Sequence, residues 1–184
     1  FTGSSGRGTL SDTHPLCFES SLAIRPGASF VANVQSDLVL FLGSRLSLFY
    51  IFGDIFPKTA KFIQVDIEAE EIGRNRAVDL GVVSDIKAML AELVCVVDER
   101  KAGPKLAKQY AEWVETVRAA DVAGKAQAKP NWEKEGAPIH PLRLAREIND
   151  FMDREDDIVA ADGGDTSTWM GMTRTVRKAG HYLD

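Results

Sequence analysis

Two short motifs carry the side chains best suited to bind a nucleotide. The first is Gly43-Ser44-Arg45, and the second is centred on Asp66. The guanidinium of Arg45 can pair with a phosphate through two parallel donors, and the carboxylate of Asp66 can accept hydrogen bonds from ribose hydroxyls. The alternatives are a tight turn with a solvated arginine at the first motif and an acidic helix cap at the second.

Two glycine-rich segments can offer main-chain N–H groups to an anion. Gly3, Ser4, Ser5, Gly6 and Gly8 are small enough to leave the backbone accessible, although a plain flexible loop has the same composition. Residues 162–166 place a glycine pair before an expected helix, whose free N–H groups suit a diphosphate. Asp165 adds negative charge there, and its alternative role is to cap that helix.

The pattern of apolar residues predicts the elements that position these motifs. Continuous apolar runs at 37–43 and 60–67 are typical of strands buried on both faces of a parallel sheet. A soft helix over 28–36, a short strand over 77–83 and an amphipathic helix beginning at Asp85 complete the pattern. Alternating strands and helices indicate an α/β fold with a Rossmann-like parallel sheet.

A second α/β unit follows a connecting region. Residues 101–137 contain a charged helix around 105–120 and then a polar stretch that predicts a surface connection. His140 and Pro141 are expected to begin a further helix. The apolar pattern of residues 157–161 predicts a short buried strand directly before the glycine pair.

The composition narrows the classes of partner. The 184 residues are 45% hydrophobic and 27% charged, with a net charge of -5. Because the balance is mildly acidic, nucleic acid is not expected as a partner. No apolar run approaches the length of a membrane span of about 20 residues, and no secretory signal is visible, so a cytoplasmic location is expected.

The order of the motifs resembles the thiamin-diphosphate-dependent enzymes of the acetolactate synthase, pyruvate oxidase and benzoylformate decarboxylase type. The segments that carry the resemblance are SDLVLFLGSRL, AKFIQVDIEAEEIGRN, VVSDIKAMLAEL and IHPLRLAREINDFMDREDDIVAADGGD. The resemblance implies a fragment of such an enzyme. Residues 1–100 would be a central FAD- or nucleotide-binding-type domain without its first strand, 101–137 a linker with a helix, and 138–184 the start of the thiamin-diphosphate-binding domain.

The resemblance also assigns cofactor contacts by position. The implied FAD contacts are Gly3, Ser4, Ser5, Gly6, Gly43, Ser44, Arg45, Asp66, Ile67, Ser84 and Asp85. The implied contacts to the diphosphate of thiamin diphosphate are Gly163, Gly164, Asp165 and Thr166. No catalytic residue or metal ligand is expected within this chain, because the activating glutamate and the Mg²⁺ ligands of the family would lie outside it.

Two departures from the acetolactate synthase pattern argue against a strict acetolactate synthase. The Phe-Asp-Asp-Arg that usually follows the Gly-Ala-Arg motif is replaced by Leu46-Ser47-Leu48-Phe49, and a Gly-Met-His-Gly segment is replaced by Leu22-Ala23-Ile24-Arg25. Both changes remove polar groups expected near a flavin. FAD is still expected as a cofactor because Arg45, Asp66 and Asp85 are present.

The function implied by the resemblance is to make or break a C–C bond next to the carbonyl of a 2-oxo acid or a 1,2-diketone. Acetolactate synthase, a 2-oxo acid decarboxylase and cyclohexane-1,2-dione hydrolase are close variants, and a homodimer or homotetramer is expected. The alternative from another class is a non-catalytic module that binds FAD or ADP. An NAD-dependent deacylase would need four zinc-binding cysteines, and the chain has two.

Overall fold

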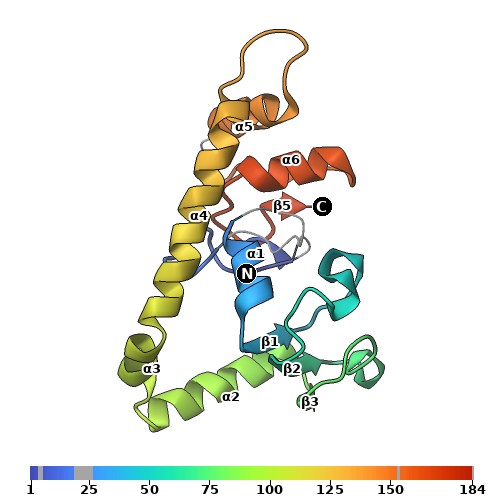
Figure 1. Cartoon of the computed structure of the whole chain (residues 1–184), viewed down its shortest axis with the longest axis vertical. Coiled ribbons are helices and arrows are strands. Elements are labelled where there is room, and N and C mark those ends of the chain that lie inside the picture. Colours follow the sequence, from blue (N-terminus) through green and yellow to red (C-terminus); the bar gives the residue numbers. More distant parts are fainter. Residues whose placement is uncertain (4–5, 19–26, 153, 184) are drawn as a thin grey trace. The chain divides into compact units, whose positions relative to one another are not determined.

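The computed structural model describes the chain in two compact units (Figure 1). Residues outside the description are 4–5, 19–26, 153 and 184. The middle unit is Phe30–Val117, and the terminal unit combines Phe1–Ser29 with Arg118–Asp184.

The elements of the middle unit alternate as the sequence predicts. In chain order they are α1 (Ala28–Gln35, which starts in the terminal unit), β1 (Leu38–Leu42), the 3-10 helix η2 (Leu48–Gly53), β2 (Lys61–Asp66), the 3-10 helix η3 (Ala69–Glu71), β3 (Leu80–Val83), α2 (Ile86–Glu99), α3 (Gly103–Gln109) and the start of α4 (Ala111–Trp132). The three strands form a parallel sheet in the order β1-β2-β3. This sheet confirms the α/β fold.

The core of the middle unit consists mainly of aromatic rings on one face of the sheet. Phe41 of β1 contacts Tyr50, Phe56 and Phe62, with ring centroids 5.2–6.4 Å apart. The sheet register explains part of this cluster, because Val39 of β1 lies opposite Phe62 of β2. Each buried ring removes a large apolar area from water, so the cluster is the main hydrophobic contribution within this unit.

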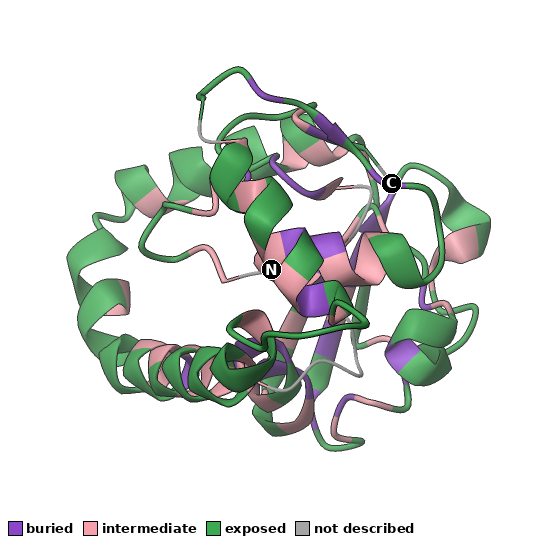
Figure 2. Cartoon of the chain, turned by 90° about the horizontal axis from the view of Figure 1, so that it is seen from above, coloured by how far each residue is buried: buried purple, intermediate pink, exposed green. Residues whose placement is uncertain are grey.

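The expectation that both faces of β1 are buried is wrong for this structure. Leu38 and Leu40 are 49% and 42% exposed, and none of the residues of α2 is buried (Figure 2). The opposite face of the same strand carries Phe41, which is buried. A continuous apolar run therefore predicted the strand correctly, but only one of its faces is covered within the described residues.

A single arginine holds the irregular segment between β1 and β2. Ile51 and Phe52 of η2 have φ angles of 49° and 52°, a left-handed conformation that costs free energy in residues other than glycine. The guanidinium of Arg76 lies 5.1 Å from the centre of the Phe62 ring and donates to four main-chain carbonyls. The acceptors are Gly53, Phe56, Pro57 and Ala60, at 2.6–3.3 Å.

The terminal unit is built around two short parallel strands. Its further elements are α5 (Pro141–Phe151), β4 (Val159–Ala160), α6 (Asp165–Thr173) and β5 (Tyr182–Leu183), with β4 paired to β5. His140 caps α5, since its Nδ1 accepts the N–H of Leu142 at 3.2 Å. The buried core of this unit contains Ala145, Val159, Ala161, Met170, Val176 and Tyr182.

Helix α4 is longer than the sequence predicts. The stretch after Ala120 was expected as an irregular connection, because it contains Gly124 and Pro130. The structure continues the helix to Trp132. Alanine, glutamine and lysine dominate this stretch and favour a helix, and Pro130 lies in the last turn, so the helix ends two residues later.

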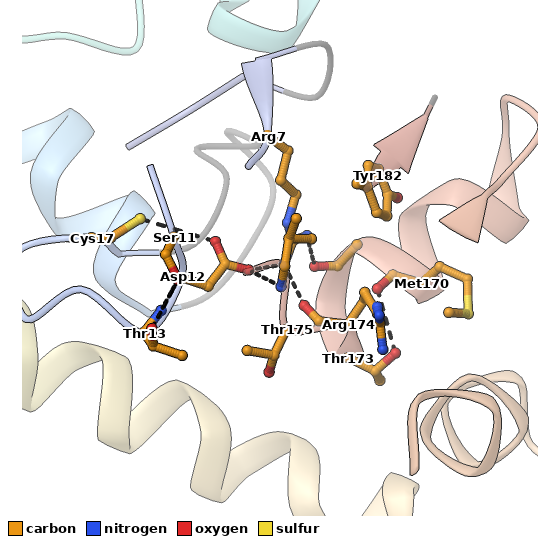
Figure 3. Close-up of polar contacts among 12 residues, drawn as sticks. Arg7, Ser11, Asp12, Thr13, Cys17, Met170, Thr173, Arg174, Thr175 and Tyr182 are labelled. Atoms are coloured by element: carbon orange, nitrogen blue, oxygen red, sulfur yellow. Dashed lines mark hydrogen bonds and ion pairs between the residues drawn. The ribbon is translucent and has the colours of Figure 1, made fainter. Parts of the chain in front are cut away.

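A buried arginine also joins the two chain segments of the terminal unit (Figure 3). Arg7 is 3% exposed and donates to the main-chain carbonyls of Gly171 and Arg174. Its Nη2 lies 3.0 Å from the carboxylate of Asp12, and its guanidinium lies 5.1 Å from the centre of the Tyr182 ring. The residues around Arg7 thus pack on α6 and β5, more than 160 positions further along the chain.

We expect Arg76→Met to destabilise the protein by about 3 kcal/mol, because part-buried carbonyls lose their donor while the apolar stem is kept. Arg74→Met is the matched control, because its side chain is 63% exposed and forms an ion pair with Glu71 at 2.9 Å. An exposed pair of this kind contributes at most about 1 kcal/mol. Urea unfolding followed by circular dichroism measures both, and equal effects would contradict the structural role of Arg76.

Gly8→Ala should destabilise the terminal unit by about 3 kcal/mol, through strain and overpacking. Gly8 has a φ of +87°, and a Cβ there would lie 2.6 Å from the carbonyl oxygen of Lys178. Gly103→Ala is the control, because nothing lies within 4 Å of a Cβ at that site. Hydrogen exchange of β5 should accelerate in the first variant alone. A protein in which both variants exchange alike would refute the packing of the N-terminal segment on β5.

Candidate functional site

The first group of predicted site residues lies at the carboxyl edge of the three-stranded sheet. The N–H of Gly43, just after β1, donates to Val65 of β2 at 2.8 Å. The N–H of Ser84, just after β3, donates to Asp66 at 3.0 Å. The structure therefore brings the ends of all three strands together, at the edge where open α/β sheets bind ligands.

Asp66 is the buried carboxylate of this edge. It is 8% exposed, and its Oδ1 accepts the N–H of Glu68 at 3.0 Å. That bond orders the turn after β2 and holds the side chain at the strand end. The neighbouring Ile67 is 65% exposed and offers an apolar contact surface.

Arg45 is held by an acidic partner that the sequence analysis missed. Its side chain is 74% exposed, and its Nε lies 3.3 Å from Oε1 of Glu71. The same oxygen lies 2.9 Å from Nη1 of Arg74, so Glu71 has two guanidinium partners. Because the Arg45 side chain is mostly exposed, its ion pair with Glu71 contributes little, and a phosphate can replace Glu71 as its partner. The acidic run directly after Asp66 was the signal for this pair.

Ser84 and Asp85 connect β3 to α2. The Oδ1 of Asp85 accepts the N–H of Ala88 at 2.9 Å, so Asp85 is the N-cap of α2. The hydroxyl of Ser84 donates to the carbonyl oxygen of Asp85 at 3.0 Å. A Cβ at Gly43 would lie 3.0 Å from the side chain of Ile86, so the start of α2 approaches the end of β1 closely.

The remaining predicted FAD contacts fall in the other unit. Gly3 and Gly6 belong to the terminal unit, where the N–H of Gly6 donates to Gly3 at 3.0 Å in a turn. Ser4 and Ser5 lie outside the described residues, as does the segment 22–25. The structure thus places the predicted FAD contacts on two separate units.

The predicted diphosphate contacts form an exposed turn between β4 and α6. Gly164 is the N-cap of α6 with a φ of 95°, and Asp165 is the first helical residue. The N–H of Gly163 donates to Oδ1 of Asp162 at 2.9 Å. Nothing lies within 4 Å of a Cβ at either glycine, so the turn is open, and the first helical N–H groups lack intrahelical acceptors.

The described part of the chain holds neither a candidate metal cluster nor a candidate membrane span. No group of three or more His, Cys, Asp and Glu residues there is arranged to hold a metal ion. Among the described helices, none is long and apolar enough to cross a membrane.

The fold is that of an α/β protein with a three-stranded parallel sheet. Residues 1–93 match the family model described as thiamine pyrophosphate enzyme, central domain. The chain belongs to this family of thiamine pyrophosphate enzymes.

Curated relatives extend the likeness across both units. A probable acetolactate synthase large subunit of Methanococcus aeolicus is 27% identical over 90% of this chain and 28% of its own length. Human 2-hydroxyacyl-CoA lyase 1 is 28% identical over 93% of the chain and 28% of its own length. Oxalyl-CoA decarboxylase of Escherichia coli is 41% identical over 49% of the chain and 16% of its own length. The chain therefore spans little more than a quarter of the length of the relatives it matches.

At the nucleotide site predicted for this edge, Glu71→Gln should raise the affinity for ADP about threefold, because it removes a carboxylate that competes with a phosphate for Arg45. Glu70→Gln is the matched control, since it removes the same charge one residue earlier in η3. Isothermal titration calorimetry measures both affinities. Equal gains in the two variants would indicate a general charge effect and would refute the specific role of the Arg45–Glu71 pair.

Proposed function

We propose that this chain is part of a thiamin-diphosphate-dependent enzyme that makes or breaks a C–C bond next to a carbonyl. The substrate class is a 2-oxo acid or a 1,2-diketone, in a reaction like that of acetolactate synthase, a 2-oxo acid decarboxylase or cyclohexane-1,2-dione hydrolase. The observation that carries this proposal is family membership over residues 1–93. Relatives named acetolactate synthase and pyruvate oxidase, aligned over most of the chain, support it.

Within this proposal, Gly163, Gly164, Asp165 and Thr166 contact the diphosphate of thiamin diphosphate. The open turn fits such a group, because two glycines leave room and the start of α6 presents main-chain N–H donors. Bound thiamin diphosphate supplies a carbanion and an electron sink for cleavage beside a carbonyl. Asp165 opposes the charge of a diphosphate, and Mg²⁺ offsets that charge, with metal ligands from outside this chain.

FAD is the second proposed cofactor, at the carboxyl edge of the sheet. Arg45 would pair with a phosphate, and Asp66 would accept hydrogen bonds from a ribose. Gly43, Ser44, Ile67, Ser84 and Asp85 would complete the contacts in the middle unit. A buried carboxylate and an exposed guanidinium at neighbouring strand ends support this proposal. A module that binds FAD or ADP without catalysis is the alternative.

A CoA thioester is a second candidate substrate class. Two observations favour it: the relative named oxalyl-CoA decarboxylase is 41% identical over half of the chain, and 2-hydroxyacyl-CoA lyase 1 aligns over both units. In either case we propose a small-molecule substrate without nucleic acid or membrane as partner. A homodimer or homotetramer in the cytoplasm completes the proposal.

The test uses the protein at the full length of its reading frame, with thiamin diphosphate and Mg²⁺. Pyruvate, benzoylformate and cyclohexane-1,2-dione represent the first class, and oxalyl-CoA and a 2-hydroxyacyl-CoA represent the second. We expect C–C products from one class, measured by mass spectrometry. A protein that binds FAD or ADP but turns over none of these compounds would support the non-catalytic alternative.

The same preparation tests the proposed diphosphate turn. Gly164→Ala should lower the affinity for thiamin diphosphate about tenfold, because its φ of +95° disfavours a Cβ. Gly136→Ala is the matched control, with a φ of +104° and the same open surroundings away from that turn. Quenching of tryptophan fluorescence reports binding. If both variants bind the cofactor like the parent protein, the turn does not contact it.

A further inference from the structure

A cavity of about 300 Å³ lies within the terminal unit, beside α4 and α6. Its volume is at the lower end of the range found for small-molecule sites. The residues that define it are Gly124, Ala128, Trp132, Leu142, Trp169 and Met172. They come from α4, the start of α5 and α6 (Figure 1), and none of the residues of the proposed diphosphate turn is among them.

Small residues on α4 leave the space open. Gly124, Ala128 and Trp132 follow one another at intervals of four residues, so they lie on one face of the helix. The first two have too little side-chain volume to fill the space opposite α6. A Cβ at Gly27 would lie 3.6 Å from the Cα of Gly124, so this face of α4 also approaches the start of α1 closely.

The walls combine aromatic surface with an unused hydrogen-bond donor. Trp132 and Trp169 both line the cavity. The Nε1 of Trp132 is buried and has no hydrogen-bond partner among the residues that the structure describes. A buried N–H without an acceptor is costly, and an acceptor supplied by a ligand removes that cost.

The rim of the cavity favours a neutral ligand. Its charged residues are Asp121 and Lys125, which form an ion pair of 2.7 Å with each other. The pair balances its own charge, so the rim offers no net attraction to an ion. Asn131 and Gln127 add neutral polar groups to the lining.

We propose that this cavity binds a small, neutral, planar aromatic molecule that carries a hydrogen-bond acceptor. The ring packs against the two indoles, and the acceptor takes the N–H of Trp132. This site is an addition to the proposed cofactor sites and does not depend on the proposed reaction.

The probe is benzamide, which combines a planar ring with a carbonyl acceptor. Toluene keeps the ring without an acceptor, and cyclohexanecarboxamide keeps the acceptor without a planar ring. The ¹⁵N-labelled chain has three indole N–H signals, from Trp113, Trp132 and Trp169. We expect benzamide to move the Trp132 signal downfield and to bind about fivefold more tightly than either other compound, since it alone makes both contacts.

Matched variants test the N–H donor of Trp132 separately from the aromatic surface of its ring. Trp132→Phe keeps an aromatic wall, so it should lower benzamide affinity about fivefold and leave toluene unaffected. Trp113→Phe removes an indole that does not line the cavity, and it should change neither affinity. Ala128→Phe should abolish binding by filling the space.

Two results would overturn the proposal. One is an unmoved Trp132 signal at saturating benzamide, and the other is equal affinity for all three compounds. If circular dichroism shows that Ala128→Phe does not fold, the benzamide affinities of Trp132→Phe and Trp113→Phe test the proposal without it.

Discussion

Buried and half-buried guanidinium groups that donate to main-chain carbonyls are the interaction on which both units depend. Short strands leave long irregular segments, and their buried carbonyls need donors. Arg76 supplies them in the middle unit, and Arg7 and Arg174 do so in the terminal unit. A guanidinium has five donors in a rigid plane, so one side chain fixes several turns at once. Regular hydrogen-bond ladders alone would not order the segments that lead to and from the strand ends.

Local patterns predicted the elements better than the contacts between them. The strands at 37–43 and 60–67 were predicted because their apolar runs are a property of the segment itself. Arg7 could not be placed in the same way, since its acceptor Gly171 lies 164 positions away. The end of α4 was also missed, because Gly124 and Pro130 suggested a loop although their neighbours favour a helix.

The part of the candidate site that follows from sheet topology is the edge where the parallel strands end. Parallel strands end at one edge of a sheet, and this topology makes Asp66 and Ser84, both assigned by resemblance, direct neighbours. The pairing of Arg45 with Glu71 was missed, because it depends on how the chain folds back after β2. Gly3 and Gly6 were assigned by resemblance to the same cofactor as Asp66. They lie in the terminal unit because Arg7 makes buried contacts there. No local sequence pattern predicts those contacts.

The departure at residues 46–49 has a structural cause as well as a functional consequence. Leu46 is 4% exposed and belongs to the aromatic core of the middle unit, so part of the change serves packing. Leu48 and Phe49 are 71% and 58% exposed, so the segment after Arg45 presents apolar surface where acetolactate synthases carry charge. Such a surface cannot attract a cofactor by charge. In the proposed nucleotide site, recognition at this edge would therefore depend on Arg45 and Asp66, and residues 46–49 would select by shape and apolar contact.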